Sequence, residues 1–171
     1  MSDGVVVVVP ASDVEREGGV AGGASRSESV RNGLAQVPAD ADIVCVHDAA
    51  RPFASTDLFE QVIAAIRDGA DAAIPAIPVT DTIKIVAPDG SGTVESTPDR
   101  STLVAVQTPQ AFAAVALRRA HELDEGNSTA TDDAMLVERA GGVVVVVDGE
   151  SPNRKITTQD DLEWARREVE E

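Results

Sequence analysis

Four short apolar runs, rich in valine and isoleucine, alternate with segments of helical periodicity. Continuous runs of this length are typical of strands buried on both faces of a parallel sheet. In the clearest helical segment, Leu58, Val62 and Ile66 recur every four residues, which predicts a helix with one face on a sheet. The predicted strands are 5–9, 43–46, 72–77 and 143–147. The alternation predicts an α/β fold.

Polar residues mark the expected ends of the helices. Ser55 or Thr56 is placed to cap the helix that Gly69 ends. Thr131 is expected to cap a helix that runs to Ala140 and stops at Gly141. Thr158 and Asp161 have the spacing of a capping box, so we expect the last helix to start there.

One segment departs from this alternation. Residues 81–86 and 93–96 read as two short strands around the glycine-rich turn 88–92. Their apolar alternation is weak for a hairpin in a core. We therefore expect a protruding β-arm, used for packing against another subunit.

Composition limits the class of protein. A chain of 171 residues is expected to form a single domain. A net charge of −16 argues against a nucleic-acid partner. Cys45 lies inside an apolar run, which favours a core residue, and a lone cysteine fits a reducing compartment. Apolar runs are too short to span a membrane and the first residues lack a signal-peptide pattern, so we expect a cytoplasmic protein.

The first candidate site is the hexapeptide 47–52, His-Asp-Ala-Ala-Arg-Pro, directly after the predicted strand 43–46. Ligands of open α/β sheets bind at the carboxyl edge of the strands. Asp48 could hold a hydroxyl or a metal there, and Arg51 a phosphate. A plain salt bridge at the strand end is the alternative.

Three further segments offer polar groups. Gly22 and Gly23 precede a helix that begins near Ser27, where the backbone could approach a base or a phosphate, or simply connect two elements. Ser29 could reach a base edge or face its own helix turn. Lys155 follows the last valine-rich strand and could neutralise a phosphoryl group, or be a surface lysine.

Two threonines complete the candidates. Thr108 follows the short apolar strand 103–106, so its hydroxyl could bind a phosphate. In the segment 131–133, Thr-Asp-Asp, helix capping accounts for Thr131 and both aspartates.

Taken together, these motifs resemble the 2-C-methyl-D-erythritol 4-phosphate cytidylyltransferase family of the non-mevalonate isoprenoid pathway. The resemblance rests on their order and spacing over nearly the whole chain; Ala49-Ala50 favours this family over the related ribitol 5-phosphate cytidylyltransferases, which rank second. The matching segments are 22–34, 47–52, 81–84, 99–100, 107–112, 131–133 and 155–157.

The resemblance implies a Rossmann-like nucleotidyltransferase fold, the fold of nucleotide-diphospho-sugar transferases, over residues 1–171, with a dimerising arm at about 79–103. It implies cytidylyl transfer from CTP to 2-C-methyl-D-erythritol 4-phosphate, with Mg²⁺ bound mainly through the CTP phosphates. Lys155 would bind phosphate in the transition state. The implied nucleotide contacts are Gly23, Ser29 and Asp48. The implied substrate contacts are Asp48, Arg51, Thr82, Arg100, Thr108 and Thr131, of which Thr82 and Arg100 would reach the neighbouring subunit.

The sequence also departs from the family pattern. Family members open with a strand and a loop of the type Pro-Ala-Ala-Gly-x-Gly-x-Arg; here Pro10-Ala11 is followed by Ser12-Asp13, so we expect the first strand and the glycine-rich loop to be missing. A fragmentary sequence, a gene start placed too late, or a short relative without transfer activity would each account for this. In the last case the chain would be a sugar-phosphate-binding or dimerising module.

Overall fold

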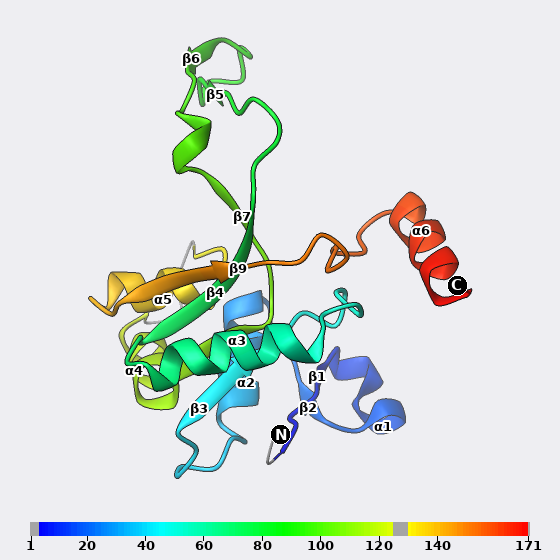
Figure 1. Cartoon of the computed structure of the whole chain (residues 1–171). Coiled ribbons are helices and arrows are strands. Elements are labelled where there is room, and N and C mark those ends of the chain that lie inside the picture. The colour runs from blue at the N-terminus through cyan, green and yellow to red at the C-terminus, as the bar shows by residue number, and fades with distance from the viewer. Residues whose placement is uncertain (1–3, 125–129, 171) are drawn as a thin grey trace.

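The computed structural model describes residues 4–124 and 130–170 and shows a sheet covered by helices on both faces (Figure 1). The main sheet has five strands. Strand β3 pairs with β8, β8 and β7 both pair with one edge of β4, and β9 pairs with the other edge of β4. The strands are β3 (Ile43–Val46), β4 (Ala72–Pro78), β7 (Val104–Val106), β8 (Gln110–Ala113) and β9 (Val144–Asp148).

Two apolar clusters fix the helices to the sheet. Helix α3 (Thr56–Arg67) packs Val62 and Ile66 on one face of the sheet, against Ala73 and Ala111. On the other face the core includes residues of α4 (Ala114–Leu123), α5 (Asp133–Arg139) and the end of α2 (Arg26–Leu34). The buried residues of this second cluster are Leu34, Ala72, Ile74, Phe112, Leu117, Ala120, Ala134, Leu136 and Val137.

The sequence predicts helix α3 well. Ser55 is its N-cap: its hydroxyl accepts from the Leu58 amide at 3.0 Å. Leu58, Val62 and Ile66 form its buried face. Gly69 has a φ of 106°, a conformation that glycine adopts without strain, and it follows the helix end.

The predicted parallel sheet is wrong in part, because the sheet is mixed. In the described part of the chain only β9 runs parallel to β4; β7 and β8 return antiparallel along its opposite edge. The segment 107–109, with a cis Thr108-Pro109 bond, separates these two strands. Strand β8 has no counterpart among the strands predicted from the sequence. It pairs with both β3 and β4, and β4 lies in the interior of the sheet with its first five residues buried.

The prediction of a doubly buried strand at 5–9 is also wrong. Strand β1 (Val8–Val9) pairs with β2 (Val20–Ala21) alone among the described residues, in a separate parallel sheet. Helix α2 contacts β1, but much of the valine run remains accessible: Val5 is 82% exposed and Val7 is 52% exposed. A 3-10 turn (Ala11–Asp13) and the short α1 (Val14–Glu17) make the connection between β1 and β2.

The two remaining helix starts have different outcomes. Thr131 was expected to cap α5, but the cap is Asp132, whose carboxylate accepts from the Met135 amide at 2.9 Å. The capping box of α6 (Gln159–Glu170) is confirmed, since Thr158 and Asp161 each accept from the backbone amide of the other. At α6, the ring of Trp164 meets that of Phe53 with centroids 5.3 Å apart.

The predicted arm is present. Strands β5 (Ile85–Val86) and β6 (Val94–Ser96) pair antiparallel around the expected turn. Figure 1 shows this ribbon projecting from the main sheet beyond β4 and β7. A 3-10 turn (Arg100–Thr102) joins it to β7. Within the described ranges, no helix has the length and apolar character needed to cross a bilayer.

Candidate active site at the carboxyl end of β3

The hexapeptide after β3 is held by a chain of hydrogen bonds. The Asp48 amide donates to the Thr108 hydroxyl at 3.0 Å, and that hydroxyl lies 3.1 Å from His47 Nδ1. His47 Nε2 lies 3.0 Å from the Arg51 carbonyl, which can only accept, so the imidazole proton is on Nε2 and the Thr108 hydroxyl donates to Nδ1. Burial lowers the pKa of His47, which keeps the ring neutral in this role. Thr108 therefore orients the turn that carries Asp48.

Asp48 and Lys155 form the central ion pair. Lys155 Nζ donates to Asp48 Oδ2 at 2.7 Å, and the Lys155 side chain is 46% exposed against 20% for Asp48. Arg26 Nε lies 3.8 Å from the other Asp48 oxygen. Burial alone would raise the pKa of Asp48, but the hydrogen bond and charge of Lys155, with the charges of Arg26 and Arg51, lower it below its usual value. Asp48 is thus an anion held between cations.

A buried polar cluster holds the segment that carries Lys155. Asn153 is fully buried, and its amide donates to the Thr108 carbonyl at 2.8 Å and to Gln107 Oε1 at 3.3 Å. Arg51 donates to the Asn153 carbonyl at 2.8 Å. Burial lowers the pKa of the Arg51 guanidinium from its ordinary value, and the charge of nearby Asp48 partly offsets this decrease. The Ile156 amide donates to the Ala50 carbonyl at 2.8 Å. Lys155 is therefore placed against the hexapeptide by backbone contacts on both sides of it.

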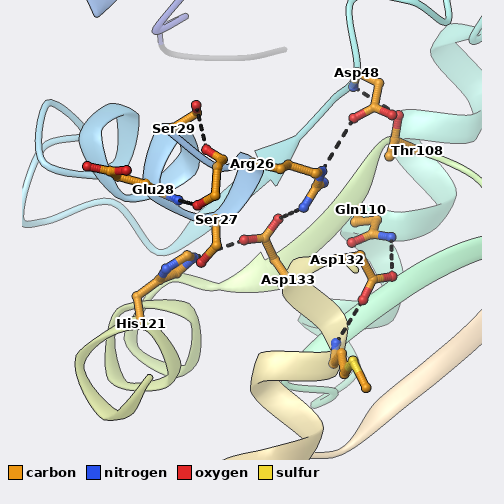
Figure 2. A network of polar contacts seen from close by, with 12 residues as sticks. Arg26, Ser27, Glu28, Ser29, Asp48, Thr108, Gln110, His121, Asp132 and Asp133 are labelled. Atoms are coloured by element: carbon orange, nitrogen blue, oxygen red, sulfur yellow. Dashed lines mark hydrogen bonds and ion pairs between the residues drawn. The ribbon is translucent and has the colours of Figure 1, made fainter. Parts of the chain in front are cut away.

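The glycine pair lies at the start of α2. The Gly23 amide donates to the Ser29 hydroxyl at 3.0 Å, and this hydroxyl donates to the Ser25 carbonyl at 2.8 Å. The Glu28 side chain lies across Gly23, where a Cβ would come within 2.2 Å of it, and its carboxylate accepts from the Ala24 amide. Figure 2 shows Ser29 and Glu28 in this first turn. Two of the three predicted nucleotide contacts, Gly23 and Ser29, thus lie together, and the Glu28 side chain leaves no room for a side chain at position 23.

The other predicted residues lie apart from this ion pair. Thr82 is an exposed residue on the arm, and Arg100 at the arm's base donates to the Thr80 carbonyl at 2.6 Å. Thr131 is exposed just before α5. At the arm's base there is an open cavity of about 730 Å³, lined among others by Thr80, Arg100 and Asp148. The structure therefore brings together Asp48, Arg51, Thr108 and Lys155, and leaves the arm residues at a second location.

The chemistry of this cluster is electrostatic. It offers the cations Lys155, Arg26 and Arg51 around one carboxylate, which suits the binding of a phosphoryl group. Cys45 is no nucleophile, because burial raises the pKa of its thiol to about 11. Over residues 4–124 and 130–170 no group of three acidic, histidine or cysteine side chains is arranged to hold a metal ion.

Several residues that support the site are not predicted from the sequence. Arg26 belongs to the matching segment 22–34, but the position of its guanidinium between Asp48 and Asp133 is seen only in the structure (Figure 2). Gln107 and Asn153 were likewise not singled out as supports of the site. No sequence signal identifies these pairs, because the partners are 22–107 residues apart and meet only through the fold.

Comparison with known proteins connects this geometry to a family. Residues 4–171 match the family model described as IspD: 2-C-methyl-D-erythritol 4-phosphate cytidylyltransferase. The chain belongs to the IspD family. Its fold is accordingly the Rossmann-like nucleotidyltransferase fold, and the family is one of transferases of isoprenoid biosynthesis.

Individual relatives agree with this IspD assignment. A Rhodococcus jostii protein named 2-C-methyl-D-erythritol 4-phosphate cytidylyltransferase is 51% identical, over 99% of this chain and 76% of its own length. The bifunctional enzyme IspD/IspF of Oleidesulfovibrio alaskensis is 50% identical over 84% of this chain, and the match spans 36% of that longer protein. The chain thus corresponds to about a third of the length of such bifunctional relatives.

Solved structures of the family are also similar. The 4-diphosphocytidyl-2C-methyl-D-erythritol synthase of Anaerococcus prevotii superimposes with a TM-score of 0.86 at 33% identity, covering 99% of this chain and 82% of that one. The 2-C-methyl-D-erythritol 4-phosphate cytidylyltransferase of Thermus thermophilus gives a TM-score of 0.84 at 34% identity, covering 99% and 83%.

Proposed function

We propose that this chain carries out cytidylyl transfer from CTP to 2-C-methyl-D-erythritol 4-phosphate, with release of pyrophosphate, in non-mevalonate isoprenoid biosynthesis. The observation that carries the proposal is the Lys155–Asp48 pair, with Nζ and Oδ2 2.7 Å apart at the carboxyl end of β3, in a chain that matches the family over residues 4–171. The relatives named for this reaction support it.

In the proposed reaction a phosphate oxygen of the acceptor attacks the α-phosphorus of CTP directly. The bond from that phosphorus to the bridging oxygen breaks, and pyrophosphate leaves. Lys155 would bind a phosphate oxygen as negative charge develops there. The cluster needs to position and neutralise rather than to supply a nucleophile, which fits its composition of cations and hydroxyls.

The remaining roles follow the same division. Gly23, Ser29 and Asp48 would contact the nucleotide; Gly23 and Ser29 already lie together through the hydrogen bond between the Gly23 amide and the Ser29 hydroxyl. Arg51 would place its charge near the acceptor, and Thr108 would act by holding the Asp48 turn, because its hydroxyl contacts both Asp48 and His47.

A magnesium ion fits this site only with help from the nucleotide. Asp48 offers a carboxylate, but one of its oxygens binds Lys155. Mg²⁺ characteristically takes one or two carboxylates and completes its shell with water and substrate phosphates. We therefore propose that the ion is held mainly by the CTP phosphates and would neutralise part of their charge.

Exposed apolar residues on the arm support a homodimer. Ile85, Val86 and Val94 are 48%, 53% and 52% exposed, and the ribbon projects from the sheet (Figure 1). A second copy of this chain would cover them, and Thr82, Arg100 and Thr131 would then contact the acceptor, the first two across the subunit boundary. Sedimentation should give a dimer for the wild type and a monomer when Ile85 and Val94 are changed to serine.

The same proposal gives the protein a cytoplasmic location, with small phosphorylated substrates and neither nucleic acid nor membrane as partner. The net charge of −16 and the single cysteine support this.

Pyrophosphate release tests the activity. The full-length product of the gene that contains this chain should release pyrophosphate from CTP when methylerythritol phosphate is added, and much less with ribitol 5-phosphate. Lys155→Met should reduce the rate by about a hundredfold or more, the size expected for losing one charged donor to a transition state. No turnover with methylerythritol phosphate, or full activity of the variant, would contradict the proposal; binding of the sugar phosphate without turnover would favour a non-catalytic module.

A further inference from the structure

A buried carboxylate lies behind the site, and the proposed reaction gives it no task. Asp133, at the start of α5, has a side chain only 1% exposed. Its Oδ2 accepts from Arg26 Nη1 at 2.6 Å, and its Oδ1 lies 2.9 Å from His121 Nε2. His121, on α4, is itself 3% exposed by side chain. Figure 2 shows Asp133 between the two basic groups.

Local structure does not explain this carboxylate. The N-cap of α5 is Asp132, which also accepts from the Gln110 amide group at 3.0 Å. The residues that follow, Ala134, Leu136 and Val137, are buried and apolar, so an apolar side chain would suit position 133 for packing. Burying an ionised carboxylate is unfavourable unless charged partners and hydrogen bonds compensate. Asp133 has both, from residues 12 and 107 positions away.

The arrangement gives Arg26 a fixed direction. Its guanidinium is bound to the buried Asp133 at one end, and its Nε lies 3.8 Å from Asp48 Oδ1 at the other. The Arg26 side chain is 34% exposed, so without an anchor it could turn toward solvent. Lys155 contacts the opposite oxygen of Asp48. Two cations therefore flank Asp48, and one of them is held from behind.

We infer that Asp133, braced by His121, is a positioning residue that holds Arg26 beside Asp48 so that the guanidinium meets the anionic nucleotide. The inference rests on the proposed function for the ligand, but not for the anchoring of Arg26. His121 contributes as a hydrogen-bond donor: its Nε2 faces a carboxylate oxygen that can only accept. Asp133 touches no ligand in this account and acts through Arg26.

A double-mutant cycle in nucleotide binding separates this role from a structural one. The affinity for CTP with Mg²⁺ is measured by calorimetry for the wild type, Arg26→Met, Asp133→Asn and the double variant, at a temperature where circular dichroism shows all four to be folded. Each single change should weaken binding about tenfold, as expected for losing one charge-assisted contact. The double variant should be no weaker than Arg26→Met, because Asp133 acts only through that residue.

Asp132→Asn is the matched control. It removes the same formal charge one residue away, and asparagine keeps the N-cap function. The buried Gln110 amide can turn to accept from the new side-chain amide group. CTP affinity should stay within about twofold of the wild type, since screened charge alone has a small effect.

A second measurement needs no ligand. Relaxation of the Arg26 Nε–H signal by NMR should show a rigid side chain in the wild type and in Asp132→Asn, and a mobile one in Asp133→Asn. An equally rigid Arg26 in Asp133→Asn would overturn the anchoring.

The outcomes distinguish the two proposals. If Asp133→Asn leaves CTP affinity unchanged, or weakens it further in the Arg26→Met background, Asp133 does not act through Arg26 and the inference is wrong. If the wild type binds neither CTP nor methylerythritol phosphate, the proposed function fails, and the Arg26 mobility measurement still decides whether Asp133 holds that side chain.

Discussion

Replacing Asn153 by alanine tests whether the buried polar cluster supports the site. Asn153 is fully buried, and its amide donates to the Thr108 carbonyl at 2.8 Å and to Gln107 Oε1 at 3.3 Å. Gln107 Oε1 keeps a second donor, the Glu150 amide at 3.0 Å, so the main loss falls on the Thr108 carbonyl. One buried acceptor without a partner costs about 1–3 kcal/mol.

Urea denaturation followed by far-UV circular dichroism measures this loss. For a chain of this size the same cost corresponds to a decrease in Tm of about 2–12 °C. Ser151→Ala, an exposed position in the same loop, is the control and should change the free energy of unfolding by less than about 0.5 kcal/mol. If Asn153→Ala is no less stable than Ser151→Ala, the cluster does not hold the loop that carries Lys155.

Three further predictions concern single groups. Lys155→Met should raise the pKa of Asp48, measured by carboxyl carbon NMR. In the wild type the folded pKa of Asp48 is depressed, so the ion pair stabilises the fold above about pH 4, and this stabilisation is lost as the pH falls through the folded pKa. The variant should therefore lose less stability on acidification than the wild type. With a pKa raised to about 11, Cys45 should react with iodoacetamide at pH 8 far more slowly than the same chain in urea; equal rates would show an accessible thiol. Gly149→Ala places a Cβ within 2.9 Å of the Ala76 backbone and 2.7 Å of Gln107 Oε1, so it should lower the free energy of unfolding by about 1–3 kcal/mol in the same urea assay. An unchanged free energy of unfolding would contradict this, because it would mean that the loop shifts freely to make room.

Local patterns in the sequence predict the elements whose physics is local. Helix α3 has its cap, its apolar face and its glycine stop within one stretch, and the α6 capping box needs only Thr158 and Asp161. The arm is predicted for the same reason, because a glycine-rich turn joins two adjacent strands.

The features that the sequence does not predict depend on contacts between residues far apart in the chain. The five-residue valine run at 5–9 looks like a core strand, yet its burial depends on neighbours, and among the described residues β1 pairs only with β2. Strand β8 is not evident in the sequence because it begins at Gln110 and adds only three apolar residues, although pairing on both edges buries it. The hexapeptide was located correctly as the feature that follows β3, but its support by Thr108 and Asn153 arises only from packing.

The two lysines of the chain allow a direct test of the account's central claim, that the nucleotide binds at the Asp48–Lys155 pair. Lys84 donates to Thr97 on the arm and serves as an internal control. With carbon-13-labelled lysine, titration of CTP and Mg²⁺ should shift the Lys155 signal and leave the Lys84 signal in place. A shift of Lys84 alone, or saturable CTP binding that leaves Lys155 unchanged, would contradict the account.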